Sequence, residues 1–297
     1  MTDKQDSFEQ LRPYLMGLAY RMLGSRADAE DAVQETWLRW QKQAQAPDSA
    51  KAWLTRVCTN LCIDNLRRLK RERARYIGPW LPDPLLAAQG QRTTAAVQQN
   101  DLADSLQLAY ILLLERLTAA ERASLLLHDV FGYSFNEVAD ILAIKTATAR
   151  QTASRARRHL KSTRTRFNVA DEDIQTLGSK LQAAVTDGDL SGIVNHLSQD
   201  VELWSDGGGK ALAARNVVVG GEQVAAFLAG VFRKAAEDGS HETGTINGKP
   251  AMFFYDTNRI LITLMTLTTD AAGQVDRLLI HRNPDKLSLA DTDIVLI

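Results

Sequence analysis

Residues 51–76, KAWLTRVCTNLCIDNLRRLKRERARY, carry the side chains best suited to binding a polyanion. Steps of three and four residues place an aromatic ring, an amide and several guanidinium groups on one face of a predicted helix. The face and the basic patch beside it comprise Trp53, Arg56, Asn60, Asp64, Arg67, Arg68 and Arg71. Aromatic rings can stack on unpaired bases, and guanidinium groups can neutralise phosphates. A surface helix made soluble by arginine fits the same pattern, and charge alone does not decide between the two.

A second basic face follows further along the chain, within residues 118–161. The pairs Thr118/Glu121 and Ser134/Glu137 both fit the capping box that starts a helix, so this segment predicts helices joined by short turns. On the last of these helices small residues form one side, and long hydrogen-bond donors form the other: Arg150, Gln151, Ser154, Arg155 and Arg158. Such a face can reach base edges in a major groove. Plain helical packing is the alternative, and the basic outer face argues against it.

Residues 26–40 predict an amphipathic helix with an acidic face. Its apolar side contains two tryptophans, and the opposite side carries Asp28, Asp31 and Glu35. A solvated helix surface and a protein-docking face both fit this pattern. A catalytic pair of carboxylates does not, because the acid and the base would need contrasting environments.

The glycine-rich stretch SDGGGK, residues 205–210, does not predict a phosphate-binding loop. A P-loop requires G-x-x-x-x-G-K-[ST], whereas here Trp204 stands at the first glycine position and Ala211 at the hydroxyl position. The two cysteines, Cys58 and Cys62, lie four residues apart and are predicted to be buried thiols rather than a metal or redox site. We therefore expect no cofactor and no metal.

The charge is unevenly distributed along the 297 residues, although the net charge is only −1. Residues 1–169 contain 25 Lys and Arg against 18 Asp and Glu, while residues 170–297 contain 10 against 18. A basic front half favours a polyanionic partner. No apolar run approaches the roughly 20 residues of a membrane span, and the polar N-terminus does not look like a secretory signal, so a cytoplasmic protein is expected.

The chain divides into four parts on helical periodicity, proline content and strand patterning. Prolines 79, 82 and 84 interrupt the helical pattern and predict a linker. The expected parts are an all-α module at 1–77, a linker at 78–100, an all-α module at 101–168 and an α+β domain at 169–297. In the last part we expect helices near 173–198 and 221–236, followed by strands within 251–257, 259–269 and 274–283.

Three ordered stretches closely resemble bacterial sigma factors of the extracytoplasmic-function type: DAEDAVQETWLRW, AWLTRVCTNLCIDNLRR and LTAAERASLLLHDVFGYSFNEVADIL with RARRHL. The resemblance covers nearly all of residues 8–165 and implies a region 2 bundle and a region 4 helix-turn-helix. It implies that the acidic helix docks on the β′ clamp helices of core RNA polymerase through Asp28, Asp31, Gln34 and Glu35. The face of residues 53–71 would bind and melt the −10 element, and that of residues 150–158 would read the −35 element.

The rear half resembles a sigma subgroup with a fused SnoaL-like domain, a cone-shaped α+β barrel; the stretches that carry this are GPWLPDPL, GDLSGIVNHLSQDVELWSDGGGK, GEQVAAFLAG and NPDKL. The resemblance implies regulation in cis without a separate anti-sigma factor. We expect two rear segments to approach the linker, the residues involved being Trp80, Leu81, Pro82, Asp83, Pro84, Asp206, Gly207, Gly208, Gly209, Lys210, Asn283, Pro284, Asp285, Lys286 and Leu287.

Other functions remain open on the sequence. SnoaL-like barrels can be enzymes with an Asp or His base, for which the candidates are His196, His281, Asp206 and Asp256, although we expect no catalysis. A small-molecule ligand could occupy a cone lined by Trp204, Phe227, Phe253 and Met265. The alternative for the whole protein is a regulator that binds duplex DNA alone through its helix-turn-helix and senses a ligand.

Overall fold

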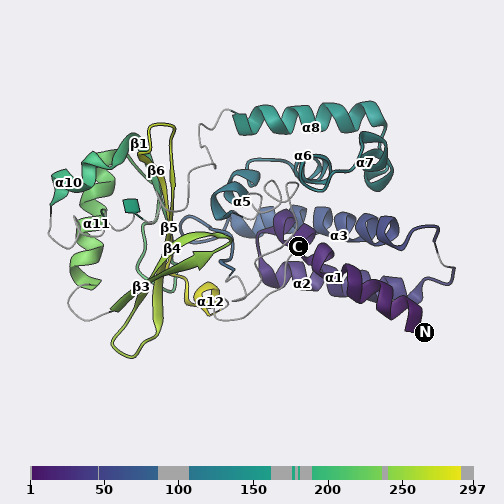
Figure 1. The fold of residues 1–297 in the computed structure, drawn as a ribbon, viewed down its shortest axis with the longest axis horizontal. Coiled ribbons are helices and arrows are strands. Elements are labelled where there is room, and N and C mark those ends of the chain that lie inside the picture. The colour runs from purple at the N-terminus through teal and green to yellow at the C-terminus, as the bar shows by residue number, and fades with distance from the viewer. Residues whose placement is uncertain are drawn as a thin grey trace.

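The computed structural model describes residues 2–45, 47–85, 107–161, 176–177, 180, 189–235 and 240–288. A helical part and a sheet part lie side by side (Figure 1). The expected boundaries near residues 100 and 168 fall outside the described residues. No helix in the described ranges has both the length and the apolar character needed to span a membrane.

The first helical module consists of α1 (Thr2–Leu23), α2 (Arg26–Lys42) and α3 (Ala50–Arg73). Helices α2 and α3 begin at Ser25 and Ser49, whose hydroxyl groups accept hydrogen bonds from backbone N–H groups of the first turn. The helices expected near 26–40 and 51–76 are thereby confirmed, and α3 ends three residues earlier than its prediction.

The second module consists of α5 (Leu108–Leu114), α6 (Ala119–Leu125), a π-helical turn η1 (Leu126–Val130), α7 (Phe135–Leu142) and α8 (Thr146–Lys161). Both predicted capping boxes are present, with reciprocal hydrogen bonds at the starts of α6 and α7. Ala143, in the left-handed conformation at φ 53°, ends α7 and turns the chain into α8. The predicted helix-turn-helix is confirmed.

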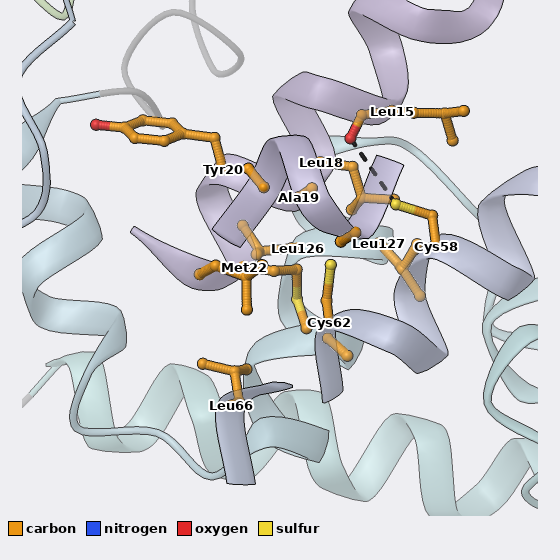
Figure 2. Packing of buried hydrophobic residues seen from close by; sticks show 14 of the residues in the cluster. Leu15, Leu18, Ala19, Tyr20, Met22, Cys58, Cys62, Leu66, Leu126 and Leu127 are labelled. Carbon is orange, nitrogen blue, oxygen red and sulfur yellow. Dashed lines mark hydrogen bonds between the residues drawn. The ribbon is translucent and has the colours of Figure 1, made fainter. Parts of the chain in front are cut away.

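The two helical modules share one hydrophobic core. Figure 2 shows Cys58 and Cys62 of α3 among Leu15 of α1 and the η1 residues Leu126 and Leu127. Both thiols are free and fully buried, as predicted, and Cys58 Sγ lies 3.9 Å from the Leu15 carbonyl oxygen. Because the core is continuous, the two modules are held against each other.

The C-terminal domain is built on a six-stranded sheet in the order β2-β1-β6-β5-β4-β3. Its strands are β1 (Leu197–Asp206), β2 (Val218–Val219), β3 (Ser240–Ile246), β4 (Lys249–Tyr255), β5 (Leu261–Thr269) and β6 (Val275–His281). Among the strands that the structure describes, only β1 and β6 pair in parallel. Helices α10 (Leu190–Asn195) and α11 (Gly221–Ala235) lie on one side of the sheet in Figure 1, and α12 (Pro284–Leu287) follows β6. This α+β domain completes the expected fold class.

Strand β1 corrects one expectation, because the sequence predicted helix up to residue 198 and no strand before residue 251. Its segment, LSQDVELWSD, mixes polar and apolar residues, and only the alternation of Val201, Leu203 and Ser205 marks the side that is buried against α11. Strand β1 ends at Asp206, directly before the glycine-rich loop, and so it positions that loop.

The two faces of the sheet are both buried, against different partners. Met265 and the partly buried Phe227 belong to the cluster on the α10 and α11 side. Trp204 and Phe253 belong to the cluster on the other side, with Leu81 of the linker. The expected ligand cone lined by Trp204, Phe227, Phe253 and Met265 is therefore wrong, because side chains alternate across a strand and these four lie on opposite faces.

Candidate nucleic-acid interface and linker junction

The predicted −10 face lies along the solvent side of α3. Arg56, Asn60, Asp64, Arg67, Arg68 and Arg71 are exposed, and Trp53 is partly buried. Arg67 pairs with Asp64 at 3.1 Å and Arg68 with Glu72 at 2.8 Å. These pairs are exposed and cost little to separate, so the guanidinium groups remain available for phosphates.

The predicted −35 face lies on α8 and is also open to solvent. Arg150, Gln151, Ser154, Arg155 and Arg158 are exposed, while Ala149, Ala153 and Ala156 on the opposite side are fully buried. The small inner residues let α8 sit close against α6 and α7, and the long outer side chains project away from the protein. The outer side of α8 therefore presents a row of exposed hydrogen-bond donors.

The acidic face of α2 is next to the −10 face. Asp31 and Gln34 are exposed, and Glu35 pairs with Arg39 at 2.9 Å. Asp28 pairs with Arg68 of α3 at 2.8 Å. Residues predicted to contact a protein and residues predicted to contact DNA therefore meet at one edge of the first module.

The second module covers the N-terminal end of the −10 face. A cavity of about 330 Å³ there is lined by Trp53 and Arg56 of α3 and by Glu137 and Asp140 of α7. Beside it, the Tyr133 hydroxyl lies 2.9 Å from the Tyr14 hydroxyl and 3.2 Å from that of Thr55. Acidic side chains thus stand opposite the end of a face that is suited to a polyanion.

Asp206, at the end of β1, holds the linker through its fully buried carboxylate. It accepts hydrogen bonds from the Tyr76 hydroxyl at 2.6 Å, from the backbone N–H of Leu81 at 2.9 Å and from Lys286 Nζ at 2.9 Å. Lys286 also donates to the Leu81 carbonyl oxygen. Both backbone polar groups of one linker residue are therefore satisfied by the rear domain.

Two cations from different parts of the chain lie close to the Trp80 ring. The Arg73 guanidinium is 3.5 Å from the ring centroid and Lys286 Nζ is 4.4 Å from it. Gly24, with φ at +68°, leaves room for this ring, since a Cβ there would stand 2.8 Å from the indole edge. The two cation–π contacts help to fix the ring in place.

The rest of the linker is held by backbone contacts to both parts. The Asp83 N–H donates to the Gly24 carbonyl at 2.8 Å, and the Tyr20 hydroxyl donates to the Asp83 carbonyl at 2.5 Å. Asn247, in the turn between β3 and β4, accepts from the Leu85 N–H at 2.8 Å and donates to the Tyr20 hydroxyl at 3.0 Å. Tyr20, Gly24 and Asn247 thus complete the set of contacts around the linker, which we call the linker junction.

Burial changes the titration of several groups at this junction. It raises the pKa of Asp83, with Lys286 acting in the opposite direction. Burial and the neighbouring Asp206 carboxylate raise the pKa of Tyr76. Burial lowers the pKa of His281 to about 4, and its Nε2 lies 2.9 Å from the Pro82 carbonyl oxygen. A neutral His281 donates to that carbonyl at neutral pH.

A second network holds the two helical modules together, and the sequence did not indicate it. Arg122 of α6 is almost fully buried and donates to the Met22 carbonyl at 2.6 Å and to Glu115 at 2.7 Å. Arg73 pairs with the same Glu115 and donates to the Leu23 carbonyl at 2.6 Å. Although burial disfavours its ionisation, the two guanidinium groups hold the pKa of Glu115 below its usual value.

The structure places four of the ten rear residues expected at the linker beside it or beside the adjoining Tyr76, and it pairs two others away from it. Asp206, Lys286 and Leu287 contact the linker or pack with Leu81, and Asn283 contacts Tyr76 directly before it, whereas Lys210 pairs with Asp285 at 2.5 Å on an exposed surface. Asn283 caps α12 and donates to the Tyr76 hydroxyl at 3.0 Å. The sequence did not identify Tyr20 and Asn247 as linker contacts. The signal for Asn247 was weak, an Asn-Gly pair of the kind found in hairpin turns.

Two catalytic candidates have structural roles in these contacts. Asp206 uses both carboxylate oxygens on the linker, on Gly208 and on Lys286, and His281 is occupied by Pro82. Asp256 accepts the N–H groups of Asn258 and Ile260 and so orders a turn. His196 ends α10 and its carbonyl oxygen accepts from Val275 N–H. Asp206, Asp256 and the Nε2 atom of His281 thus take part in structural hydrogen bonds.

Comparison with known proteins agrees with this arrangement. Residues 7–72 match the family described as Sigma-70 region 2, and residues 107–160 match Sigma-70, region 4. The chain is 35% identical to the ECF RNA polymerase sigma factor SigJ of Mycobacterium tuberculosis over 289 residues, which are 95% of this chain and 92% of that protein. This chain belongs to the extracytoplasmic-function sigma factors.

The crystal structure of the same M. tuberculosis sigma factor matches this fold over nearly its whole length. The TM-score is 0.73 at 31% identity, and the match covers 96% of this chain and 99% of that chain. The match includes the C-terminal sheet domain, and with it the predicted fold class, two sigma modules and a SnoaL-like domain, is confirmed. As a sigma factor, the protein binds core RNA polymerase and promoter DNA and directs promoter-specific initiation of transcription.

Proposed function

We propose that the C-terminal domain of this sigma factor regulates it in cis by holding the linker and keeping the two sigma modules together. The Asp206–Lys286 pair on Leu81 carries this proposal, because a buried charged pair that also bonds the backbone N–H and carbonyl oxygen of Leu81 favours one arrangement of the linker. The rear domain supplies these contacts from the same chain. No separate anti-sigma factor is then required for regulation.

In this structure the two sigma modules are packed against each other, which we call the closed arrangement. It differs from the arrangement needed on a promoter. The −10 and −35 elements are about 25 base pairs apart, which is about 85 Å at about 3.4 Å per pair. In this structure α3 and α7 share one core, and α7 packs beside α8. The modules must therefore separate before both faces can contact their elements, and the linker must lose its present contacts.

The roles proposed for individual residues follow the exposed faces. The acidic face of α2, with Asp28, Asp31, Gln34 and Glu35, would dock on the β′ clamp helices of the polymerase. The face of α3, from Trp53 to Arg71, would bind the melted −10 strand by stacking and phosphate contacts. Residues 150–158 of α8 would read the −35 duplex. In this proposal the protein performs no catalytic step of its own.

Two truncations test the regulatory role by run-off transcription with purified core polymerase. A stop before Asn283 removes Lys286 but leaves the sheet over Leu81, Leu108 and Leu112. We expect it to raise transcription several-fold. A stop after residue 168 exposes those three leucines, so we expect it to yield less folded protein as well.

The control for this test is the full chain with Lys210→Gln, which removes an exposed ion pair outside the linker contacts. We expect its transcription to equal that of the unaltered chain. If both truncated chains also transcribed like the full chain, regulation by the C-terminal domain would be excluded.

A further inference from the structure

Helix α7 of the second module covers one end of the predicted −10 face, and no role described above uses this contact. Trp53 and Arg56 of α3 line the cavity of about 330 Å³ together with Glu137 and Asp140 of α7. The other end of the face, with Arg71, lies outside this cavity and is open to solvent. The two ends of one predicted DNA-binding face therefore differ in what lies opposite them.

Packing and hydrogen bonds hold α7 in this position. Its Val138 and Ile141 belong to the same buried cluster as Leu54 of α3. The Tyr133 hydroxyl, which precedes α7, lies 2.9 Å from the Tyr14 hydroxyl of α1. These five residues all belong to the two sigma modules, so the contact is separate from the linker junction.

Helix α7 reverses the sign of the charge at that end of the face. The first module alone places Arg56 and the neighbouring Lys51 against Asp48, which favours a phosphate. Glu137 and Asp140 add two carboxylates, so three acidic groups then stand against two basic ones. Hydrogen bonds within the capping box of α7 lower the pKa of Glu137, and this carboxyl group is ionised at neutral pH. A phosphate that approaches this end therefore meets repulsion.

We propose that α7 is a built-in competitor of the melted −10 strand. In the closed arrangement it keeps phosphates away from Arg56 and covers the space beside the Trp53 ring, so the strand can use only the part of the face from Asn60 to Arg71. Full capture of the strand requires α7 to leave. A strand that binds the open arrangement in turn shifts the population toward it. This inference rests on the role proposed above for the α3 face and assigns an inhibitor to that face.

Fluorescence anisotropy of the full chain with a labelled oligo-dT of about 15 nucleotides tests the competition without polymerase, because base stacking tolerates any sequence. Glu137→Gln combined with Asp140→Asn, the α7 variant, removes both carboxylates and keeps the capping box, which accepts Gln. We expect the α7 variant to bind the oligonucleotide at least about threefold more tightly than the unaltered chain.

The control for the α7 variant is Asp200→Asn combined with Glu222→Gln. It makes the same change in charge at exposed positions of the C-terminal domain and should leave the affinity for oligo-dT unchanged. Equal affinities of the α7 variant and this control, or no binding by the α7 variant, would overturn the proposal.

Arg56→Gln locates the competition on the face, because Arg56 is exposed and its replacement leaves the core intact. We expect Arg56→Gln to weaken oligo-dT binding less than about twofold in the unaltered chain and at least about fivefold in the α7 variant. Arg71→Gln, at the uncovered end, should weaken binding by the same factor in both proteins. An Arg56→Gln effect of equal size in both proteins would contradict the proposal.

The same measurements separate this proposal from the role of the face itself. If neither Arg56→Gln nor Arg71→Gln weakened binding in either protein, the α3 face would not bind DNA, and both proposals would fall. A loss from Arg71→Gln without any gain from the α7 variant would keep the face and remove the competitor. Truncation of the C-terminal domain tests a different contact, so its outcome leaves this one standing.

Discussion

Lys286 shows how one buried cation can connect two domains. Its Nζ lies 2.9 Å from Asp206, 3.8 Å from Asp83 and 4.4 Å from the centre of the Trp80 ring. A buried ammonium group is costly unless charges and hydrogen bonds compensate it, and here a carboxylate, a carbonyl and a ring do so. Such a group favours one arrangement strongly, because every displaced arrangement leaves it without these partners.

Replacing this cation should be far more harmful than replacing an exposed one. We expect Lys286→Met to lower the free energy of unfolding by about 3 kcal/mol, because it leaves the buried Asp206 and Asp83 without their cation. Lys210→Gln, which breaks the exposed pair with Asp285, should change it by less than about 1 kcal/mol. Urea unfolding of both variants measures the difference, and equal losses would mean that the buried pair has no special weight.

His281 should make the junction sensitive to acid. Its pKa is about 4 in the folded protein, below the usual 6.5, so the unfolded chain takes up a proton more readily. The stability from a neutral His281 is complete above about pH 6.5 and is lost as the pH falls through about 4, amounting to about 3 kcal/mol. Denaturation at several pH values should show this slope, and His281→Gln should reduce it. An unchanged slope in that variant would assign the acid sensitivity to other groups.

At the scale of elements, α5 explains how the second module joins the rear domain. Leu108, Ala109 and Leu112 belong to the cluster under the sheet, while Ile111 and Leu114 belong to the core of the sigma modules. One short helix is therefore buried on both sides. An apolar run such as LAYILLL predicts burial from the sequence, but periodicity cannot tell which neighbours cover it.

The turn between α7 and α8 offers a test of backbone strain. Ala143 has φ at 53°, a conformation in which glycine is favoured over residues with a Cβ. Ala143→Gly should therefore stabilise the second module by about 1 kcal/mol. The reverse change, Gly132→Ala, meets open space but has φ at +71° and should destabilise by about the same amount. Thermal unfolding of both variants checks the pair, and shifts of the same sign would refute the strain argument.

At the scale of the molecule, the closed arrangement depends on contacts that break when the two sigma modules separate. The Tyr133 hydroxyl joins the second module to Tyr14 and Thr55 of the first. We expect Tyr133→Phe to weaken the closed arrangement by about 1 kcal/mol and so to raise the apparent affinity for core polymerase up to about fivefold. Fluorescence anisotropy with labelled sigma factor measures that affinity.

The control for Tyr133→Phe is Thr36→Val, which also removes a buried hydroxyl. The Thr36 hydroxyl donates to the Ala32 carbonyl within α2 at 2.7 Å and takes no part in the contact between modules. The affinity of the Thr36→Val variant for core polymerase should match that of the unaltered chain. Equal affinity of all three proteins would show that opening does not limit binding.

Local patterns in the sequence determined the helices, their caps and the faces that α2, α3 and α8 present to solvent. These features depend on residues three or four positions apart, whose spacing is fixed by helical geometry. The burial of the Cys58 and Cys62 thiols was predicted from the same helical spacing. The roles of the faces came from the resemblance to sigma factors, since charge and spacing alone left a soluble surface helix equally possible.

Only the tertiary structure decided how the domains meet. Asn247 bonds Tyr20 across 227 positions of the chain, and Lys286 reaches Leu81 across 205. Strand β1, which carries Asp206, has a mixed pattern that predicted no strand, and the two faces of the sheet could not be assigned to their partners. Such contacts depend on chain topology and on which surfaces are buried together, and no local periodicity encodes them.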